Sequence, residues 1–382
     1  MLDPIPPPPQ WLQDAFRPLL EKLYLHSMTL HIHEIIISLV FYQFVQSVLS
    51  PWLSTALFPK IYPNFNRRTK LNWDVHVVSL VQSSLINAVA LWVMVADKER
   101  WNMTSAERVF GYSGTCGLIQ AMAVGYFVWD LIVSTRYIKL FGIGLWFHAV
   151  SALWVFSLGF RPFVNYYGPT FILYELSSPF LNFHWFFDKV NMTGSNAQWY
   201  NGMALLAVFF SCRLVWGTWQ SVRVFIDIFG AYRQSTGAAL ESFNIYSLLQ
   251  DTNHAACTTE ACTLAREQVS HFAGFHAGGI PFWLVLTYLG SNFILNSLNF
   301  YWFSKMIEAV MKRFTKPAPG VEEKTKLEKP DSHDVVLEAA ATLEEEERVF
   351  INGGMPEEVN GKSVMATSST ATAPSSTRRR KA

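Results

Sequence analysis

Long apolar segments separated by short polar loops dominate the pattern of this chain. A helix needs about 20 largely apolar residues to cross the ~30 Å hydrocarbon core of a bilayer, and about seven segments reach roughly that length. They cover residues 31–53, 75–96, 114–135, 141–160, 169–187, 203–228 and 281–310. The pattern predicts an all-α fold, a polytopic membrane helix bundle of about seven transmembrane helices.

The fifth segment is less uniform than the others. Glu175, Pro179 and Asn182 interrupt it. Pro169 fits the first turn of a helix, whereas Pro179 would kink the helix, which neighbouring helices in a bundle can accommodate. The segment is therefore predicted to span the membrane with a break.

Lysine and arginine are distributed unevenly between the two sets of loops. With an odd number of spans, most of them lie on one side: Lys60, Arg67, Arg68, Lys70, Arg136, Lys139, Lys189, Lys312, Arg313 and Lys316. Such loops stay cytosolic, so the N-terminus is predicted to be lumenal and the C-terminus cytosolic. The sequons at Asn102 and Asn191 would then lie on opposite sides, and only Asn102 could be glycosylated.

Composition divides the chain into three parts. Residues 1–30 form a predicted lumenal N-terminal segment, 31–316 the transmembrane domain and 317–382 a cytosolic tail. The tail is rich in Glu, Lys, Ser, Thr and Ala, so it is predicted to be disordered. The long loop from 230 to 279 is expected to contain helical pieces. Its Cys257 and Cys262 are compatible with a disulfide if the loop is lumenal, and their spacing does not decide it.

Charge argues against some classes of function. Only 15% of the residues are Asp, Glu, Lys or Arg and the net charge is +1. No basic helical stripe is interleaved with aromatic residues, so the chain is not expected to bind nucleic acid.

The sequence contains none of the common metal or catalytic motifs. The spacing of the histidines and cysteines in the long loop matches no zinc site: His254, Cys257, Cys262, His271 and His276. Phosphate-loop, Rossmann, GxSxG and HExxH motifs are absent from the sequence. We therefore expect no metal and no cofactor.

Polar side chains recur at helical spacing within the apolar segments, on shared faces. The stripes are His76, Ser79, Ser83 and Asn87; Tyr126, Asp130 and Ser134; Glu175, Ser178 and Asn182; Arg213, Gly217, Gln220 and Asp227; and Tyr288, Asn292, Asn296 and Asn299. Such residues can join helices by hydrogen bonds, or they can line a shared chamber. Their number favours an internal polar cavity, with a predicted lining of Tyr126, Ser178, Asn182, Arg213, Gln220, Asn292 and Asn296.

Ionisable groups in the third, fourth and fifth segments are the strongest candidates for a site. A charge at membrane depth costs at least ~2.5–3.5 kcal/mol, so by default it faces the protein interior and marks a function. Asp130, His148 and Glu175 are therefore predicted to converge. A lone histidine such as His148 can be structural or a general base. His184 and Asp188 are expected to pair at the cytosolic interface, because they lie four residues apart on a helix.

Short motifs in these segments resemble a known family. The strings YFVWDLIVS, GLWFHAVSALW and ELSSPFLNFHWFFDK, in this order, resemble the TLC (Tram–Lag–CLN homology) domain over residues 72–312. The phrase from Glu175 to Asn182 is most similar to the small transmembrane-56-type members. The resemblance implies a multi-helix membrane bundle around a lipid-sized cavity, usually in the endoplasmic reticulum.

The resemblance also implies a function. Ceramide synthases of this superfamily join an acyl chain to a sphingoid base and carry adjacent histidines in the segment that matches the fourth here, where this chain has Phe147 and His148. Of the polar residues that the resemblance implies for this family, the chain retains Asp130, His148 and Glu175. We expect a role in lipid homeostasis by binding, sensing or moving a membrane lipid, with a sphingolipid or acyl-CoA as the implied partner.

Two other functions are compatible with the sequence. One is an acyltransferase, with His148 as general base and Asp130 or Glu175 orienting it. The other is a transporter or channel for a polar solute, which the stripe of asparagines in the seventh segment suggests.

Overall fold

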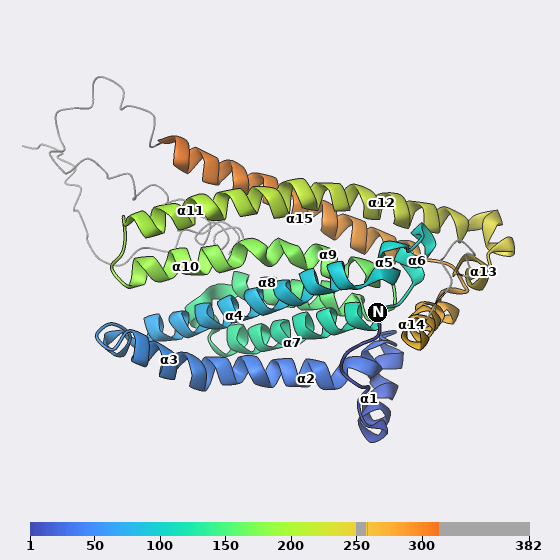
Figure 1. The fold of residues 1–382 in the computed structure, drawn as a ribbon, viewed down its shortest axis with the longest axis horizontal. Helices are drawn as coiled ribbons and strands as arrows, with labels where there is room; N and C mark the ends of the chain where they lie inside the picture. The colour runs from blue at the N-terminus through green and yellow to red at the C-terminus, as the bar shows by residue number, and fades with distance from the viewer. Residues whose placement is uncertain (250–256, 258, 313–382) are drawn as a thin grey trace, which may run out of the picture.

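Long helices lying side by side make up the fold, as Figure 1 shows. The structure, a computed structural model, describes residues 1–249, 257 and 259–312, and within these residues every regular element is helical. The predicted tail, 317–382, lies outside the described residues. The all-α prediction is confirmed.

Each predicted apolar segment coincides with helix. The first is α2 (Met28–Phe44), η1 (Val45–Leu49) and α3 (Ser50–Leu57), the second is α4 (Arg67–Ala96), the third is α7 (Gly114–Arg136) and the fourth is α8 (Ile138–Leu158). The fifth is α9 (Gly168–Ile172), η4 (Leu173–Ser177) and α10 (Ser178–Lys189). The sixth is α11 (Asn196–Phe209), η5 (Phe210–Trp216) and α12 (Gly217–Gln234), and the seventh is α15 (Phe282–Lys312).

Four stretches of continuous helix in the described chain are long and apolar enough to cross a membrane: Met28–Leu57, Arg67–Ala96, Ser105–Arg136 and Asn196–Gln234. Helices α8, α10 and α15 run alongside them in Figure 1. The number of about seven crossings therefore stays a prediction.

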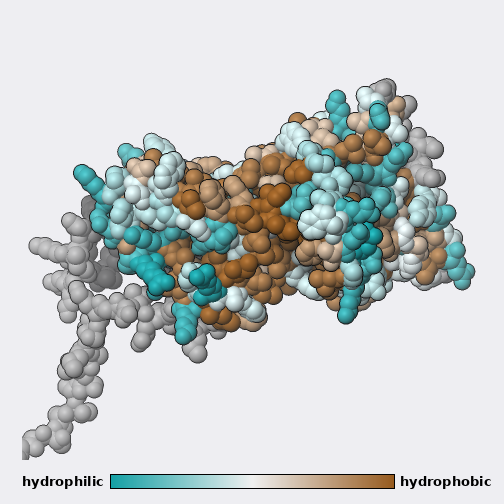
Figure 2. All heavy atoms as spheres, turned by 90° about the horizontal axis from the view of Figure 1, so that it is seen from below, coloured by the Kyte–Doolittle hydropathy of each residue, from teal (hydrophilic) through white to brown (hydrophobic). Residues whose placement is uncertain are grey.

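Large apolar side chains cover the outside of the bundle. Figure 2 shows a hydrophobic band on one face, with hydrophilic residues gathered toward both ends. Exposed members include Ile37, Val40, Phe44, Val48, Trp92, Val95, Ile132, Val215, Trp219, Ile226 and Phe293. A soluble monomer rarely exposes so large a continuous apolar surface, so this band fits contact with lipid acyl chains.

Capping residues and proline explain where several helices begin and break. Asn66 caps α4 by accepting a hydrogen bond from the backbone N–H of Thr69. Pro169 lies in the first turn of α9, as predicted. Pro179 occupies the first turn of α10, directly after the 3₁₀ turn η4, so the predicted break is present. The first and sixth segments contain π-helical turns, η1 and η5, a distortion that is frequent at functional sites.

Short elements close the end of the bundle at which the chain starts. They are α1 (Gln10–Lys22), α5 (Lys98–Trp101), α6 (Ser105–Phe110), η3 (Asn165–Tyr167), η6 (Gly237–Ser242), α13 (Ile245–Leu249), α14 (Glu260–Ser270) and η7 (Ala273–His276). The remaining short element, η2 (Tyr62–Asn64), lies at the opposite end, between α3 and α4. The pieces from η6 to η7 confirm the predicted helical content of the loop 230–279. Burial lowers the pKa of His276 to about 4, so its neutral ring donates from Nε2 to the Pro162 carbonyl at 2.7 Å.

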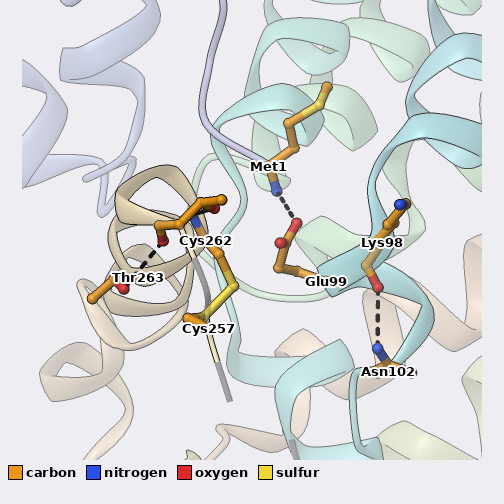
Figure 3. The surroundings of a disulfide bond; sticks show 8 residues. Met1, Lys98, Glu99, Asn102, Cys257, Cys262 and Thr263 are labelled. Atoms are coloured by element: carbon orange, nitrogen blue, oxygen red, sulfur yellow. Dashed lines mark hydrogen bonds and ion pairs between the residues drawn. A yellow bond between two sulfur atoms is a disulfide. The ribbon is translucent and has the colours of Figure 1, made fainter. Parts of the chain in front are cut away.

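A disulfide joins Cys257 and Cys262 at this end, which settles the pairing that the spacing left open. Figure 3 shows it near Met1 and Asn102, with the Met1 nitrogen 3.7 Å from the Glu99 carboxylate. The other sequon residue, Asn191, lies at the opposite end, between α10 and α11. The two sequons therefore lie at opposite ends of the bundle, and their placement on opposite sides of a membrane stays a prediction.

Candidate functional site

The 3₁₀ turn η4 separates two groups of polar side chains in the middle of the bundle. Glu175 and the following Ser178 belong to a group shared with α4. Tyr174 and Ser177 belong to a group shared with η5, α12 and α15. A regular α-helix would give these side chains different directions, so the change to 3₁₀ geometry decides which partners they meet.

The first group, which we call the Glu175 cluster, consists of Glu175, Ser178, Asn182, His76 and Ser79. The Ser178 hydroxyl donates to Glu175 Oε2 at 2.7 Å. Asn182 Nδ2 donates to Ser79 Oγ at 3.0 Å, and Asn182 Oδ1 lies 2.8 Å from His76 Nδ1. The stripes predicted on the second and fifth segments thus face each other.

Asp130 approaches this cluster from α7. Tyr126, one turn earlier on α7, lies beside Ser79 and within electrostatic range of both Asp130 and Glu175. The predicted convergence of Asp130 with Glu175 stays a prediction. The side chain of His148 lies outside the described residues, so its place in this site stays a prediction.

The second group, which we call the Arg213 cluster, is built around a cation on the π-helical turn η5. Arg213 Nε donates to the Tyr174 carbonyl at 3.0 Å and to Ser177 Oγ at 3.2 Å, and Nη1 donates to Asn299 Oδ1 at 3.4 Å. None of these acceptors is charged. Arg213 makes no salt bridge with any carboxylate in the described part of the chain.

Gly217 allows the Tyr174 ring to approach the backbone of α12. A Cβ on Gly217 would lie 2.6 Å from Tyr174 Cε1, so no larger residue fits there without displacing the ring. The Tyr174 hydroxyl donates to Asn296 Oδ1 at 3.4 Å, and Asn296 Nδ2 donates to Ser221 Oγ at 2.7 Å and to Asn292 Oδ1 at 3.1 Å. Asn292 and Asn296, two of the predicted lining residues, thus take part in hydrogen bonds within and between helices.

Several buried polar atoms around the Arg213 cluster have no hydrogen-bond partner: Gln220 Oε1, Asn299 Nδ2 and Trp302 Nε1. Asn299 is fully buried, and its oxygen is already used by Arg213. Leaving such a group unpaired costs about 1–3 kcal/mol, so each requires an explanation. One explanation is a ligand that supplies acceptors to the Asn299 and Trp302 donors.

The predicted pairing of His184 with Asp188 is wrong. Both ring nitrogens of His184 are buried without a hydrogen-bond partner. Asp188 instead accepts hydrogen bonds from Lys189 Nζ at 2.7 Å and from Thr193 Oγ1 at 2.9 Å. The adjacent lysine and the following turn offer stronger partners than a histidine that is buried in the bundle.

Sequence reasoning missed Tyr174, Ser177 and Trp302. A regular helical period does not align Tyr174 and Ser177 with Arg213, because the 3₁₀ turn shifts the phase of the fifth segment. Trp302 continues the stripe that ends at Asn299, one turn further along α15. Extending that stripe would have found it.

Comparison with known proteins gives the family. Residues 72–308 match the family model of the TLC domain. The chain is 35% identical over 309 residues to an uncharacterized TLC domain-containing protein of Schizosaccharomyces pombe, covering 81% of this chain and 89% of that protein. It is 30% identical to topoisomerase I damage affected protein 4 of Saccharomyces cerevisiae, covering 78% and 92% of the two chains.

A vertebrate relative matches a shorter region. The chain is 30% identical over 184 residues to TLC domain-containing protein 4 of Homo sapiens, which covers 47% of this chain and 67% of that protein. The motifs from Tyr126 to Lys189 lie inside the region matched by the family model. This chain therefore belongs to the TLC domain family and is an integral membrane protein.

Proposed function

We propose that this protein binds a membrane lipid in the helix bundle and acts in lipid homeostasis by sensing or moving that lipid. The observation that carries the proposal is Arg213, a cation within a membrane-spanning helix whose hydrogen bonds all go to neutral acceptors. Intramembrane charges are costly and usually have a counter-charge. A lipid phosphate would provide that counter-charge.

The surroundings of Arg213 support an anionic ligand. Asn299 Nδ2 and Trp302 Nε1, both buried donors without an acceptor, lie on α15, whose Asn299 contacts Arg213. A phosphate offers several acceptor oxygens and binds arginine through charge-assisted hydrogen bonds. The ligand class that fits these donors is therefore a lipid with a phosphate in its headgroup.

The Glu175 cluster adds a second ionisable group to the middle of the bundle. Cys212, which precedes Arg213, lies within electrostatic range of both Arg213 and Glu175. Glu175 accepts a hydrogen bond from Ser178 and makes no salt bridge within the described residues. A zwitterionic headgroup, with its phosphate at Arg213 and its ammonium toward Glu175, would satisfy both groups.

The described residues make no contact that favours either alternative function, the acyltransferase or the channel. The acyltransferase hypothesis depends on His148, whose side chain lies outside the described residues. The channel hypothesis rests on the asparagine stripe, and Asn296 already donates hydrogen bonds to Asn292 and to Ser221. We therefore rank lipid binding first.

Mass spectrometry of bound lipid tests the proposal. We expect the protein, purified in mild detergent and washed extensively, to retain a phosphate-bearing lipid that is enriched over its share in the starting membrane. An unrelated polytopic protein, purified from the same cells in the same detergent, is the control. A lipid profile equal to that of the control would refute the proposal.

We further propose that the protein resides in the endoplasmic reticulum with its N-terminus in the lumen. The disulfide lies at the end of the bundle where the chain starts, and disulfides form in oxidising compartments. The α3–α4 and α10–α11 connections, with Arg67, Arg68 and Lys189, lie at the opposite end, as does the last turn of α15. Basic loops favour the cytosol.

Protease protection in intact microsomes checks this orientation. A tag placed after Ala382 is expected to be digested without detergent, because the tail should be cytosolic. A tag before Met1 is expected to be digested only after detergent is added. Protection of the tag after Ala382 would contradict the proposed topology.

A further inference from the structure

A third buried polar cluster has its three ionisable residues before residue 72, where the match to the TLC domain begins. It combines Asp3 of the N-terminal segment with His31 and Glu34 of α2, and with Tyr112, which precedes α7. His31 Nδ1 lies 2.8 Å from Glu34 Oε2 and 3.2 Å from Asp3 Oδ2. The three ligand atoms all lie within 4.8 Å of one another.

The residues of this cluster are buried, unlike the carboxylates of an ordinary acidic surface patch. The side chains of His31 and Glu34 are each only 1% exposed, and that of Asp3 is 14% exposed. Glu34 Oε1 is buried and has no hydrogen-bond partner. His33 Nε2 lies 3.8 Å from this oxygen, too far for a hydrogen bond.

The cluster places two carboxyl groups against one imidazole. Asp3 and Glu34 carry two negative charges when ionised, and the salt bridges they make in the described chain involve histidines alone. A doubly protonated His31 would supply one positive charge. Buried carboxylates require pairing or a metal, and a divalent cation with neutral His31 would bring the net charge to zero.

The surrounding residues hold His31 in the orientation that a metal ligand needs. Its second ring nitrogen, Nε2, lies 2.5 Å from the Tyr112 hydroxyl, the kind of outer contact that fixes the tautomer of a ligating histidine. A Cβ on Gly117 would lie 2.2 Å from His31 Nε2, so the glycine is required for the ring to lie against α7. The site is therefore built from three separate segments of the chain.

We propose that Asp3, His31 and Glu34 bind a divalent transition metal, Zn²⁺ by the nature of the donors, at the end of the bundle where the chain starts. One imidazole and two carboxylates suit Zn²⁺, whose bonds to such ligands of about 2.0–2.2 Å place neighbouring ligand atoms roughly 3.3 Å apart. The distances of 2.8 and 3.2 Å from His31 Nδ1 need only a small adjustment. The free Oε1 of Glu34, His33 or water completes the coordination.

Metal at this site would tie the N-terminal segment to α2. The expected result is about one Zn²⁺ per chain in elemental analysis of the full protein, purified without a histidine tag. EDTA should remove the metal and lower the melting temperature, and Zn²⁺ should restore it, because a ligand that binds only the folded state stabilises it.

Substitutions separate metal binding from simple hydrogen bonding. Asp3→Asn should abolish the response of the melting temperature to Zn²⁺, whereas Asp14→Asn, on the exposed face of α1, should leave it unchanged. Tyr112→Phe should keep the fold and weaken Zn²⁺ binding by roughly 10–100-fold, the usual effect of losing an outer partner. A purified protein without bound metal, whose melting temperature does not respond to Zn²⁺, Mn²⁺ or Fe²⁺, would overturn the proposal, as would an Asp3→Asn variant with the wild-type response.

Discussion

Replacing Arg108 by methionine is expected to destabilise the protein by about 3–5 kcal/mol, the cost of leaving a buried charge without its partner. Arg108 Nε lies 2.6 Å from Asp227 Oδ2 and its Nη2 lies 2.7 Å from Oδ1, which is a bidentate pair. The Asp227 side chain is 2% exposed, so water cannot replace the guanidinium. The free energy of unfolding in mild detergent, or the melting temperature, measures the effect.

Two variants make this prediction specific. Arg17→Met breaks an exposed pair with Asp14 on α1 and should cost at most about 1 kcal/mol. The double variant Arg108→Met with Asp227→Leu should recover much of the lost stability, because an apolar pair of similar volume often replaces a buried ion pair without loss. A single Arg108→Met variant as stable as Arg17→Met would show that the pair contributes little.

This pair also shows how a sequence stripe can mislead. Asp227 lies on the predicted polar face of the sixth segment together with Arg213 and Gln220. In the structure, Asp227 instead joins α12 to α6 and accepts a hydrogen bond from the Tyr167 hydroxyl at 2.6 Å. Helical period identifies residues on one face, but partners from other segments decide which of them share a site.

The membrane helices were predictable because length and apolarity alone determine them. Segment 75–96 became α4, which starts eight residues earlier at Arg67, and segment 114–135 became α7 almost unchanged. The π-helical turn around Arg213 and the 3₁₀ turn before Ser178 were not predictable, because tertiary contacts decide such distortions. Pro179 signalled the kink in the fifth segment but not the 3₁₀ geometry before it.

The candidate site was predictable in part, because helical spacing shows which polar residues share a face. Glu175, Ser178 and Asn182 share a face as their spacing suggested, and Asn182 hydrogen-bonds to Ser79 and His76 of the stripe on the second segment. The cluster of Asp3, His31 and Glu34 was missed because Asp3 is distant in sequence and reaches α2 only through the fold of the first residues. His31 and Glu34, three residues apart at the start of an apolar helix, were the visible signal.

The largest functional effect is expected for Arg213→Gln. Losing the charge should weaken retention of a phosphate-bearing lipid by about tenfold to 100-fold, because a hydrogen bond to a charged group contributes about 1.5–3 kcal/mol. Glutamine can still donate to the Tyr174 carbonyl, so the contact that orients this side chain is not lost entirely. The variant should therefore fold, which its melting temperature checks.

The matched control for Arg213→Gln is Arg223→Gln. Arg223 lies further along α12, 5.5 Å from the centre of the Tyr166 ring, and is not part of the Arg213 cluster. Arg213→Lys keeps the charge but loses the planar donor set, so lipid retention should fall between wild type and Arg213→Gln.

The readout is the amount of phosphate-bearing lipid per chain after identical washing. If folded Arg213→Gln retains as much of this lipid as Arg223→Gln, Arg213 does not bind the headgroup. The unpaired donors of Asn299 and Trp302 would then need another acceptor, because their burial still requires one.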